Sequence, residues 1–204
     1  MEFDEWEPIY LEIVEYFGFD RGEDEKAAEI LASLLPRDDL PLLAEAIGGK
    51  DVCVCGNAST LGREIPLVSE VVLAADAAAL VLYSRGIRPD AIFTDLDGAT
   101  GEFVEMNSEG TVVVVHAHGD NVPLLRHWVP QFRGPVVGTT QGRPLPHVHN
   151  FGGFTDGDRA VFAAQSLGAA SIALLGFNLD DTRVDPIKRA KLAWARRLLE
   201  LVLP

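Results

Sequence analysis

Short runs of apolar residues, each followed by polar residues, constrain the fold of this chain more than any other feature. The runs are continuously apolar, whereas a strand with one face in water alternates apolar and polar residues. Continuous runs are typical of parallel strands that helices cover on both faces. We interpret six runs as strands, at residues 51–55, 68–75, 91–94, 111–115, 135–138 and 171–175.

Helical segments separate several of these runs. They lie near residues 77–85, 121–132, 157–167 and 186–202, and a further helix is expected to begin at Ser59-Thr60. Alternation of strands and helices predicts an α/β fold with a doubly wound, mostly parallel, Rossmann-like sheet. We therefore expect an α/β catalytic domain over residues 49–204.

The first 48 residues have a different pattern and predict a small helical region without strands. Apolar residues recur at helical spacing from Trp6 to Phe17, and Gly18 with the stretch Asp20-Arg21-Gly22 is expected to end this helix. Further helices are expected at 27–35 and 40–47. We interpret the apolar stripe of the first helix as intramolecular core, with a contact in a homo-oligomer as the alternative.

The net charge of −14 excludes some partners. Residues 1–49 carry 14 acids and only 3 bases, and a field of this sign disfavours nonspecific binding of nucleic acid. The sequence has no uncharged apolar run of the roughly 20 residues that a membrane span needs. The acidic opening Met1-Glu2-Phe3-Asp4-Glu5 is unlike a targeting leader, so we expect a cytoplasmic protein. Cys53 and Cys55, the two cysteines, are expected to be buried thiols.

Polar residues gather where the predicted strands end. In open α/β sheets the carboxyl edge of the strands is where ligands bind. The residues that follow strand ends are Asn57, Ser59, Asp76, Asp95, Asp97, His116, His118, Asp120 and Thr139.

The pair Asp95 and Asp97 predicts a metal site. Two carboxylates that leave a strand on one side repel each other unless a cation lies between them. Oxygen ligands suit Mg²⁺, which also takes phosphate oxygens as ligands. A solvated turn is the alternative for an isolated Asp-x-Asp, and Asp76 and Asp120 at neighbouring strand ends favour the metal site.

The segment from Gly56 to Leu61 follows the first strand and opens a helix. Backbone N–H groups at a helix start, with the hydroxyls of Ser59 and Thr60, suit a phosphate. Ordinary capping of the helix is an equally good interpretation of this segment alone.

The segment His116-Ala117-His118-Gly119-Asp120-Asn121 is similar to the zinc-binding run of metallo-β-lactamase-type hydrolases. That run continues with a histidine, where this chain has Asn121. His147 and His149 are further ligand candidates, which keeps a metallohydrolase open. We favour contact of the histidines with phosphate or substrate, and a helix cap is the alternative for Asp120-Asn121.

Two later segments add candidates. Asp156 and Arg159 follow a glycine-containing loop at a helix start, where they can reach a heterocycle or a phosphate. Lys188 and Lys191 share a face of the last helix and can reach phosphates. A plain loop-to-helix junction and a solvated basic face are the alternatives.

Together these segments resemble the archaeal-type 6-hydroxymethyl-7,8-dihydropterin pyrophosphokinases, which have a thiamin-pyrophosphokinase-like catalytic domain. The resemblance runs from about Asp51 to the last helix. Two departures matter: Ala58 and Ser59 stand where related loops have Gly and Pro, and Gly98 stands where thiamin pyrophosphokinases have Ser. The second departure favours the pterin branch. The segments that carry the resemblance are 55–61, 74–76, 89–98, 116–121, 139–141, 153–159 and 175–176.

The resemblance implies Mg²⁺-dependent transfer of diphosphate from ATP to the pterin hydroxymethyl group, with release of AMP, in tetrahydromethanopterin or folate-type biosynthesis. We expect Asp95 and Asp97 to bind the metal and Asp76 and Asp120 to assist. His118 or one of the carboxylates is expected to accept the hydroxyl proton. The expected substrate- and nucleotide-binding residues are Gly56, Asn57, Ser59, Thr60, Thr94, His116, Asn121, Thr139, Thr140, Gln141, Asp156, Arg159, Lys188 and Lys191.

Three other functions stay open from the sequence. Asp-x-Asp also holds the metal in nucleotide-sugar-dependent transferases. A metallohydrolase would use His116, His118 and Asp120. A nucleotide-sensing module would use the acidic helices as its partner surface.

Overall fold

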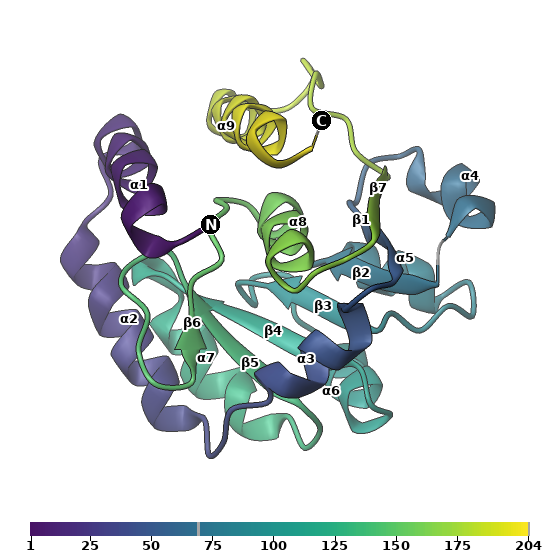
Figure 1. Ribbon diagram of the computed structural model, residues 1–204, viewed down its shortest axis with the longest axis horizontal. Coiled ribbons are helices and arrows are strands. Elements are labelled where there is room, and N and C mark those ends of the chain that lie inside the picture. The colour runs from purple at the N-terminus through teal and green to yellow at the C-terminus, as the bar shows by residue number, and fades with distance from the viewer. Residues whose placement is uncertain (69, 204) are drawn as a thin grey trace.

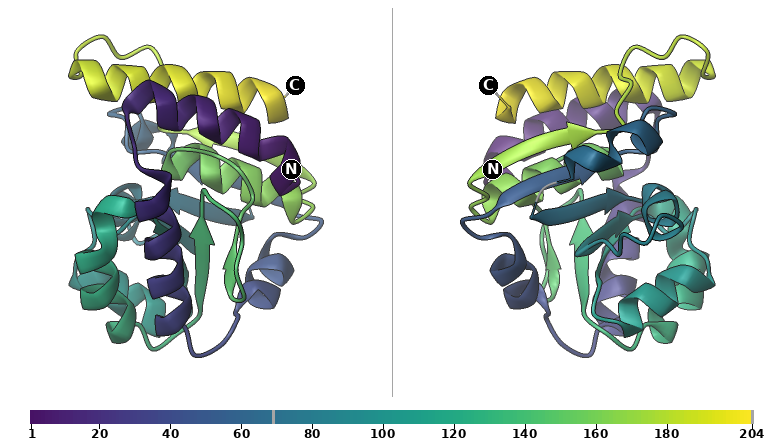
Figure 2. Two further views of the ribbon diagram at one scale, coloured as in Figure 1. Left: turned by 90° about the vertical axis from the view of Figure 1, so that its left-hand side faces the viewer. Right: turned by 90° about the vertical axis from the view of Figure 1, so that its right-hand side faces the viewer.

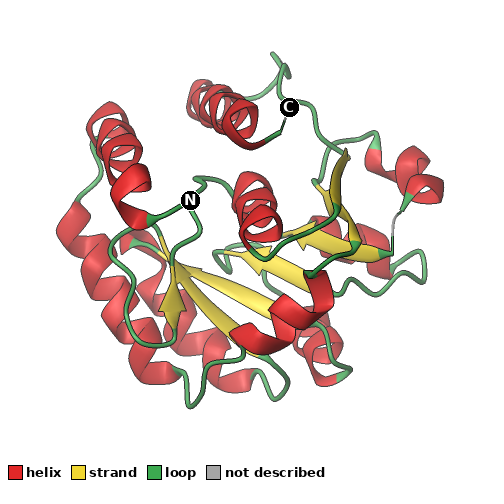
Figure 3. Ribbon diagram, viewed as in Figure 1, coloured by secondary structure: helices red, strands yellow, loops and turns green. Residues whose placement is uncertain are grey.

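A seven-stranded parallel sheet forms the centre of the molecule (Figures 1 and 3). The computed structural model describes residues 1–68 and 70–203. The strand order is β6-β5-β4-β3-β2-β1-β7, and every neighbouring pair is parallel. The predicted doubly wound α/β fold is confirmed. The strands are β1 (Asp51–Cys55), β2 (Val71–Ala75), β3 (Ala91–Thr94), β4 (Val112–Ala117), β5 (Val136–Thr140), β6 (Val148–His149) and β7 (Ser171–Leu175).

Helices cover both faces of the sheet, as the continuous apolar strands require. On one face α2, α5, α6 and α7 pack against alternate strand residues such as Val113 and Val115. On the other face α3, α8 and α9 pack against the intervening residues, such as Val112 and Val114. The helices are α1 (Phe3–Phe17), α2 (Arg21–Leu34), α3 (Leu40–Ile47), α4 (Leu61–Glu64), α5 (Ala78–Tyr83), α6 (Gly101–Ser108), α7 (Val122–Trp128), α8 (Asp156–Ser166) and α9 (Pro186–Val202), with 3-10 turns η1 (Ile65–Leu67), η2 (Gly119–Asn121) and η3 (Val129–Gln131).

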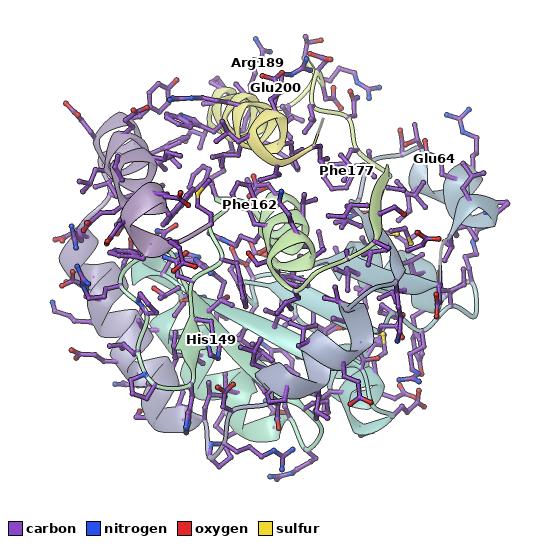
Figure 4. All side chains as sticks on the ribbon, viewed as in Figure 1. Glu64, His149, Phe162, Phe177, Arg189 and Glu200 are labelled. Atoms are coloured by element: carbon purple, nitrogen blue, oxygen red, sulfur yellow. The ribbon has the colours of Figure 1, made fainter. Side chains whose placement is uncertain are left out.

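The first helix, α1, packs over α8 and α9 rather than directly on the sheet (Figure 2). Its buried residues Trp6, Tyr10 and Ile13 form a third core cluster with Phe162 and Leu198. The ring of Trp6 meets that of Phe162, labelled in Figure 4, edge to face at 6.3 Å. The interpretation of the apolar stripe of this helix as intramolecular core is therefore confirmed.

Some predicted boundaries were wrong. Gly18 ends α1 with a φ of +70°, as predicted, whereas Asp20 begins the next helix: its carboxylate accepts the Gly22 N–H at 2.7 Å and caps α2. Both β4 and β5 extend two residues farther than predicted, so His116, Thr139 and Thr140 lie inside strands and not after them. The strand predicted at 68–75 begins at Val71, and its position 69 lies outside the described residues.

The direction of the chain across the sheet reverses beside β1. From β1 to β6 the strands are added on one side, and β7 then returns to pair with the other side of β1. Ligands bind outside the carboxyl ends of the strands at such a reversal. At this point Gly56 and Gly176 are in close contact, since a Cβ on Gly56 would lie 2.8 Å from the Gly176 carbonyl oxygen.

Two of the three N-terminal helices, α2 and α3, pack directly on the sheet. Leu31 of α2 belongs to the same core cluster as Val113 and Val115, and Leu43 of α3 packs on the opposite face. The division of the chain at residues 48 and 49 stays a prediction. Cys53 and Cys55 are buried, as predicted. Within the described residues, a helix with the length and apolarity of a membrane span is not found.

Candidate active site

Three carboxylates converge at the carboxyl edge of the sheet. Asp76 follows β2, Asp95 follows β3, and Asp156 is the first residue of α8. One oxygen of each lies within 4.8 Å of the others, and in the described part of the chain they are the one group of three acidic or metal-ligating side chains this close. A carboxylate triad of this kind suits a hard cation such as Mg²⁺.

The backbone is strained at two of the positions that build this group. Asp76 has a φ of +45° and Leu96 a φ of +73°, in the left-handed region that side chains disfavour. Hydrogen bonds hold both residues in place: the Thr94 hydroxyl donates to Asp76 Oδ1 at 2.7 Å and accepts the Leu96 N–H at 2.8 Å. Strain of this kind is concentrated at functional sites. The predicted binding residue Thr94 therefore holds the turn together.

The pKa values in the group report crowded negative charge. Burial raises the pKa of Asp76, and burial together with the nearby Asp95 charge raises the pKa values of Asp156 and Asp97. A cation bound among these groups would relieve their repulsion. The electrostatics of the group therefore favour binding of a divalent cation.

Asp95 is the exception, because its pKa lies below the ordinary value. Burial by itself would raise it, but the hydrogen bond with His118, the N–H of Asp97 and the Arg159 charge hold it down. His118 Nε2 lies 3.4 Å from Asp95 Oδ2, and the Asp97 N–H donates to Oδ1 at 3.1 Å. Asp95 is therefore the carboxylate of the group that stays ionised most readily.

Asn121 links the ends of β3 and β4. Its Nδ2 donates to the carbonyl of Asp95 at 2.8 Å and to that of His116 at 2.7 Å, and its Oδ1 accepts the His118 N–H. Asn121 is also the N-cap residue of α7, as the alternative interpretation has it, although its side chain makes no cap hydrogen bond at this helix start. These hydrogen bonds make Asn121 a buried residue that holds the segment from His116 to His118 against the end of β3.

His116 presents a buried acceptor. The Thr139 hydroxyl donates to the Val115 carbonyl at 3.1 Å, so its oxygen accepts from His116 Nδ1, 3.1 Å away. Burial lowers the pKa of His116 well below its ordinary value, which keeps the ring neutral. The proton is assigned to Nδ1 by these bonds, which leaves Nε2 as a lone-pair acceptor. Nε2 is buried and, among the described residues, without a hydrogen-bond partner.

Arg159 lies on the first turns of α8 and is 8% exposed. Its Nη1 donates to Asp156 Oδ1 at 3.3 Å, and its Nη2 to Gln141 Oε1 at 3.5 Å. Its Nε is buried with no partner in the described residues. A buried guanidinium with a free donor beside carboxylates suits an anionic ligand such as a phosphate.

The loops at the strand reversal form the other side of the candidate site. The ring of Phe177 packs between Gly56 and Gly157. A Cβ on Gly56 would lie 3.2 Å from one edge of the ring, and a Cβ on Gly157 would lie 2.8 Å from the other edge. Glu64, labelled with Phe177 in Figure 4, accepts the Gly176 N–H at 2.6 Å and ties α4 to the loop after β7. The phosphate-binding segment predicted after β1 is thereby joined to the start of α8.

The remaining predicted residues differ in position. Thr140 accepts the Gly142 N–H at 3.2 Å, and Thr60 precedes α4 with its hydroxyl buried. The charge of Lys191 partly offsets the raised pKa of Asp97, so one of the two predicted lysines interacts with the acidic group. The other residues lie on the surface: Asn57 and Ser59 after β1, Asp120 in η2, and Lys188 in the first turn of α9.

Asp120 and the histidines do not assemble as a metallohydrolase would need. In the part of the chain that the structure describes, His116, His118 and Asp120 do not form a close group of three. His149 instead contacts Asp38 at 3.0 Å at the far edge of the sheet.

Comparison with known proteins matches this chain to the family described as 6-hydroxymethylpterin diphosphokinase MptE-like, over residues 29–184. Three archaeal proteins named 6-hydroxymethyl-7,8-dihydropterin pyrophosphokinase align with 98% of the chain. They are 40% identical in Methanothermobacter thermautotrophicus, 39% in Pyrococcus furiosus and 34% in Methanocaldococcus jannaschii, and the alignments cover 94%, 94% and 95% of those proteins. The chain belongs to the MptE-like family. The resemblance stated from the sequence is confirmed, and so is a diphosphokinase-type transferase.

A solved structure shares the fold of this MptE-like chain. It is the MAf glycosyltransferase from Magnetospirillum magneticum AMB-1, with a TM-score of 0.50 and 16% identity. The likeness covers 80% of this chain and 29% of that one. At this identity it supports the architecture alone.

The sequence did not reveal three residues that buttress the site of the MptE-like chain. Trp6 donates to the Gln141 carbonyl at 2.9 Å, Tyr10 to Asp24 at 2.7 Å, and Asp24 accepts from Gln141 at 2.7 Å. One signal was present: Asp24 precedes Ala27, Ala28 and Leu31 on the apolar stripe of α2, where a charge is unexpected.

Proposed function

We propose that this chain transfers the diphosphate of ATP to the hydroxymethyl group of 6-hydroxymethyl-7,8-dihydropterin and releases AMP. The observation that carries the proposal is the triad of Asp76, Asp95 and Asp156. It lies at the carboxyl edge of the sheet in a chain that aligns almost end to end with three proteins named for this activity. A role in making a tetrahydromethanopterin- or folate-type pterin follows from the product.

The donor set fits Mg²⁺. All three side chains offer oxygen, and the raised pKa values of Asp76 and Asp156 reflect the burial and crowding of their negative charges. We assign Asp76, Asp95 and Asp156 as the ligands, with Asp97 beside them. Bound there, Mg²⁺ would neutralise charge on polyphosphate oxygens and so favour attack at phosphorus.

Cationic side chains of this chain complete the phosphate site. Arg159 keeps one buried N–H without a partner among the described residues, and the charge of Lys191 partly offsets the raised pKa of Asp97. Both charges would hold the diphosphate that is transferred and stabilise the charge that develops on it. The loop that begins at Gly56 would hold the rest of the nucleotide at the strand reversal.

His116 is proposed to contact the acceptor substrate. Its Nε2 is a buried acceptor that needs a donor, and a pterin ring or its hydroxyl group supplies N–H or O–H donors. His118, held by the Asp95 carboxylate, or one of the carboxylates is proposed to take the hydroxyl proton.

The deciding experiment follows the nucleotide product. Purified protein is mixed with ATP, Mg²⁺ and 6-hydroxymethyl-7,8-dihydropterin, and the products are separated by anion exchange and identified by ³¹P NMR. We expect AMP and a pterin diphosphate in equal amounts. ADP as the product would contradict the proposal and indicate single phosphoryl transfer.

Two controls exclude other sources of AMP. Without the pterin, AMP should stay at the background level, because hydrolysis of ATP is not the reaction. In a second control a nucleotide sugar replaces ATP and should give no transfer to the pterin; sugar transfer there would favour the glycosyltransferase alternative.

A further inference from the structure

We infer that Asp24 of α2 is a positioning residue of this active site, and that the N-terminal helices thereby set the geometry of Arg159 and His118. The inference rests on the proposed function for the reaction concerned. Asp24 is 3% exposed and lies 95 and 117 positions in sequence from two of its hydrogen-bond partners.

One oxygen of Asp24 orients the arginine. Oδ2 accepts from Tyr10 at 2.7 Å and from Gln141 Nε2 at 2.7 Å. A carboxylate only accepts, so Gln141 must turn its NH₂ to Asp24 and its oxygen to Arg159. That oxygen receives Arg159 Nη2 at 3.5 Å, while Nη1 donates to Asp156 at 3.3 Å. The acceptor on α2 thus fixes which end of Gln141 faces the arginine.

The other oxygen of Asp24 holds the histidine turn. Oδ1 accepts the Gly119 N–H at 2.8 Å. Gly119 follows His118, whose Nε2 contacts Asp95. The turn is packed closely on α2, because a Cβ on Gly119 would lie 2.7 Å from the Cβ of Glu23. Asp24 therefore holds both Gln141, which contacts Arg159, and the turn that follows His118.

Tyr10 ensures that this network stays in one state. Burial and the hydrogen bond with Asp24 raise the pKa of Tyr10, so its hydroxyl remains a donor at neutral pH. The indole of Trp6 holds the Gln141 carbonyl at 2.9 Å. In the buried polar contacts between α1, α2 and Gln141, which follows β5, every donor therefore faces an acceptor.

Asp24→Asn tests the inference, because one carboxamide cannot serve both arms. If its oxygen faces Gly119, its NH₂ faces Gln141, which must then turn its own NH₂ toward Arg159. If its oxygen faces Gln141, the Gly119 N–H loses its acceptor. We expect kcat to fall on the order of 10- to 100-fold, the range for partners that orient ligands, with KM for ATP changed far less.

Asp39→Asn is the matched control. Asp39 is also a buried aspartate of the N-terminal region, 7% exposed, and it accepts the Val136 N–H at 2.9 Å at the opposite end of β5. Its loss should lower Tm and leave kcat unchanged. If Asp24→Asn lowers Tm and leaves kcat unchanged in the same way, Asp24 is merely structural and the inference fails.

Asp24→Asn combined with Gln141→Glu is the rescue. The new carboxylate at position 141 accepts both from the carboxamide introduced at position 24 and from Arg159. The oxygen of that carboxamide keeps the Gly119 N–H, so the order of donors and acceptors is restored. We expect kcat to recover most of its loss. A double variant no better than Asp24→Asn would overturn the inference, and Gln141→Met offers a second test of the arginine arm if Asp24→Asn does not fold.

A measurement without turnover separates this inference from the proposed function. In Asp24→Asn, either the amide exchange of Gly119 or the NMR signal of the Arg159 guanidinium should change, and in Asp39→Asn neither should. If the wild type makes no AMP and these changes still occur, the proposed function fails while the positioning role stands. Unchanged signals at both groups would refute the positioning role, whatever the reaction.

Discussion

Gly98 packs directly on the carboxylate of Asp76. A Cβ at position 98 would lie 2.9 Å from Asp76 Cγ and closer still to Oδ2, a separation that real Cβ atoms do not show. Gly98 is thus required here by space and not by an unusual φ, because its φ is not among the positive ones. Gly98 therefore leaves room for one of the three candidate metal ligands.

Gly98→Ser should displace the Asp76 side chain and weaken the metal site. We expect a fall in kcat/KM on the order of 100-fold, as for misplaced reacting groups, and a loss of about 1–3 kcal/mol in the free energy of unfolding from overpacking. Gly101→Ser is the control, since a Cβ there meets nothing within 4 Å. Similar kinetics in the two variants would show that Asp76 need not stay in place.

Asp156→Asn should weaken Mg²⁺ binding much more than Asp120→Asn. Asp156 belongs to the close triad, whereas Asp120 lies exposed in η2. Calorimetric titration with Mg²⁺ and an unreactive ATP analogue measures both. A larger loss for Asp120→Asn would restore the arrangement expected from the sequence, in which Asp120 assists Asp95 and Asp97.

Asn121→Ala should lower both stability and activity, because it leaves the buried carbonyls of Asp95 and His116 without their donor. The expected loss of stability is about 1–3 kcal/mol. Asn107→Ala is a closely matched control: Asn107 is also buried and links Thr111, Gly134 and Pro135 at the opposite edge of the sheet.

Thermal unfolding and steady-state kinetics separate the two asparagines. Both variants should lose Tm, and only Asn121→Ala should lose kcat beyond what the reduced folded fraction explains. An equal kinetic loss in Asn107→Ala would mean that Asn121 affects catalysis only through the global stability of the protein.

Asp38→Asn tests the contact between the loop that joins α2 to α3 and strand β6. Burial alone would raise the pKa of Asp38, but the contacts with His149 and the Leu40 N–H lower it. An acid with a lowered folded pKa contributes stability above its unfolded pKa, about 3.9, and that contribution disappears as pH falls through the folded value. Urea unfolding should therefore show a wild-type advantage at pH 7 that shrinks below about pH 4. An advantage constant with pH would disprove the ionic origin.

Much of the fold could be predicted because burial on both faces leaves a simple pattern. The runs at 51–55, 91–94 and 171–175 match β1, β3 and β7 residue for residue. The two-residue strand β6 was not predicted, since two residues carry no periodicity. The helix α6 was missed because it has only Phe103, Met106 and Asn107 buried in eight residues.

The candidate site was predictable only in part. Strand-end aspartates such as Asp95 are visible because the sheet edge is visible, and helical spacing was enough to make Lys191 a candidate. The meeting of Asp156 with Asp76 and Asp95 depends on how α8 docks, which local sequence does not specify. Asp24 was hidden for the same reason, because its partners lie about a hundred positions away.

The position of β7 also sets the order in which the molecule can be completed during synthesis. Strand β1 is made first, but its outer neighbour is β7, and Asp51 and Ser171 stand 120 positions apart. Until β7 emerges from the ribosome, β1 is an unpaired edge of apolar residues, the kind of surface that other chains join. A nascent chain of this protein should therefore need protection from aggregation until the last strand is inserted, whatever the stability of the finished enzyme.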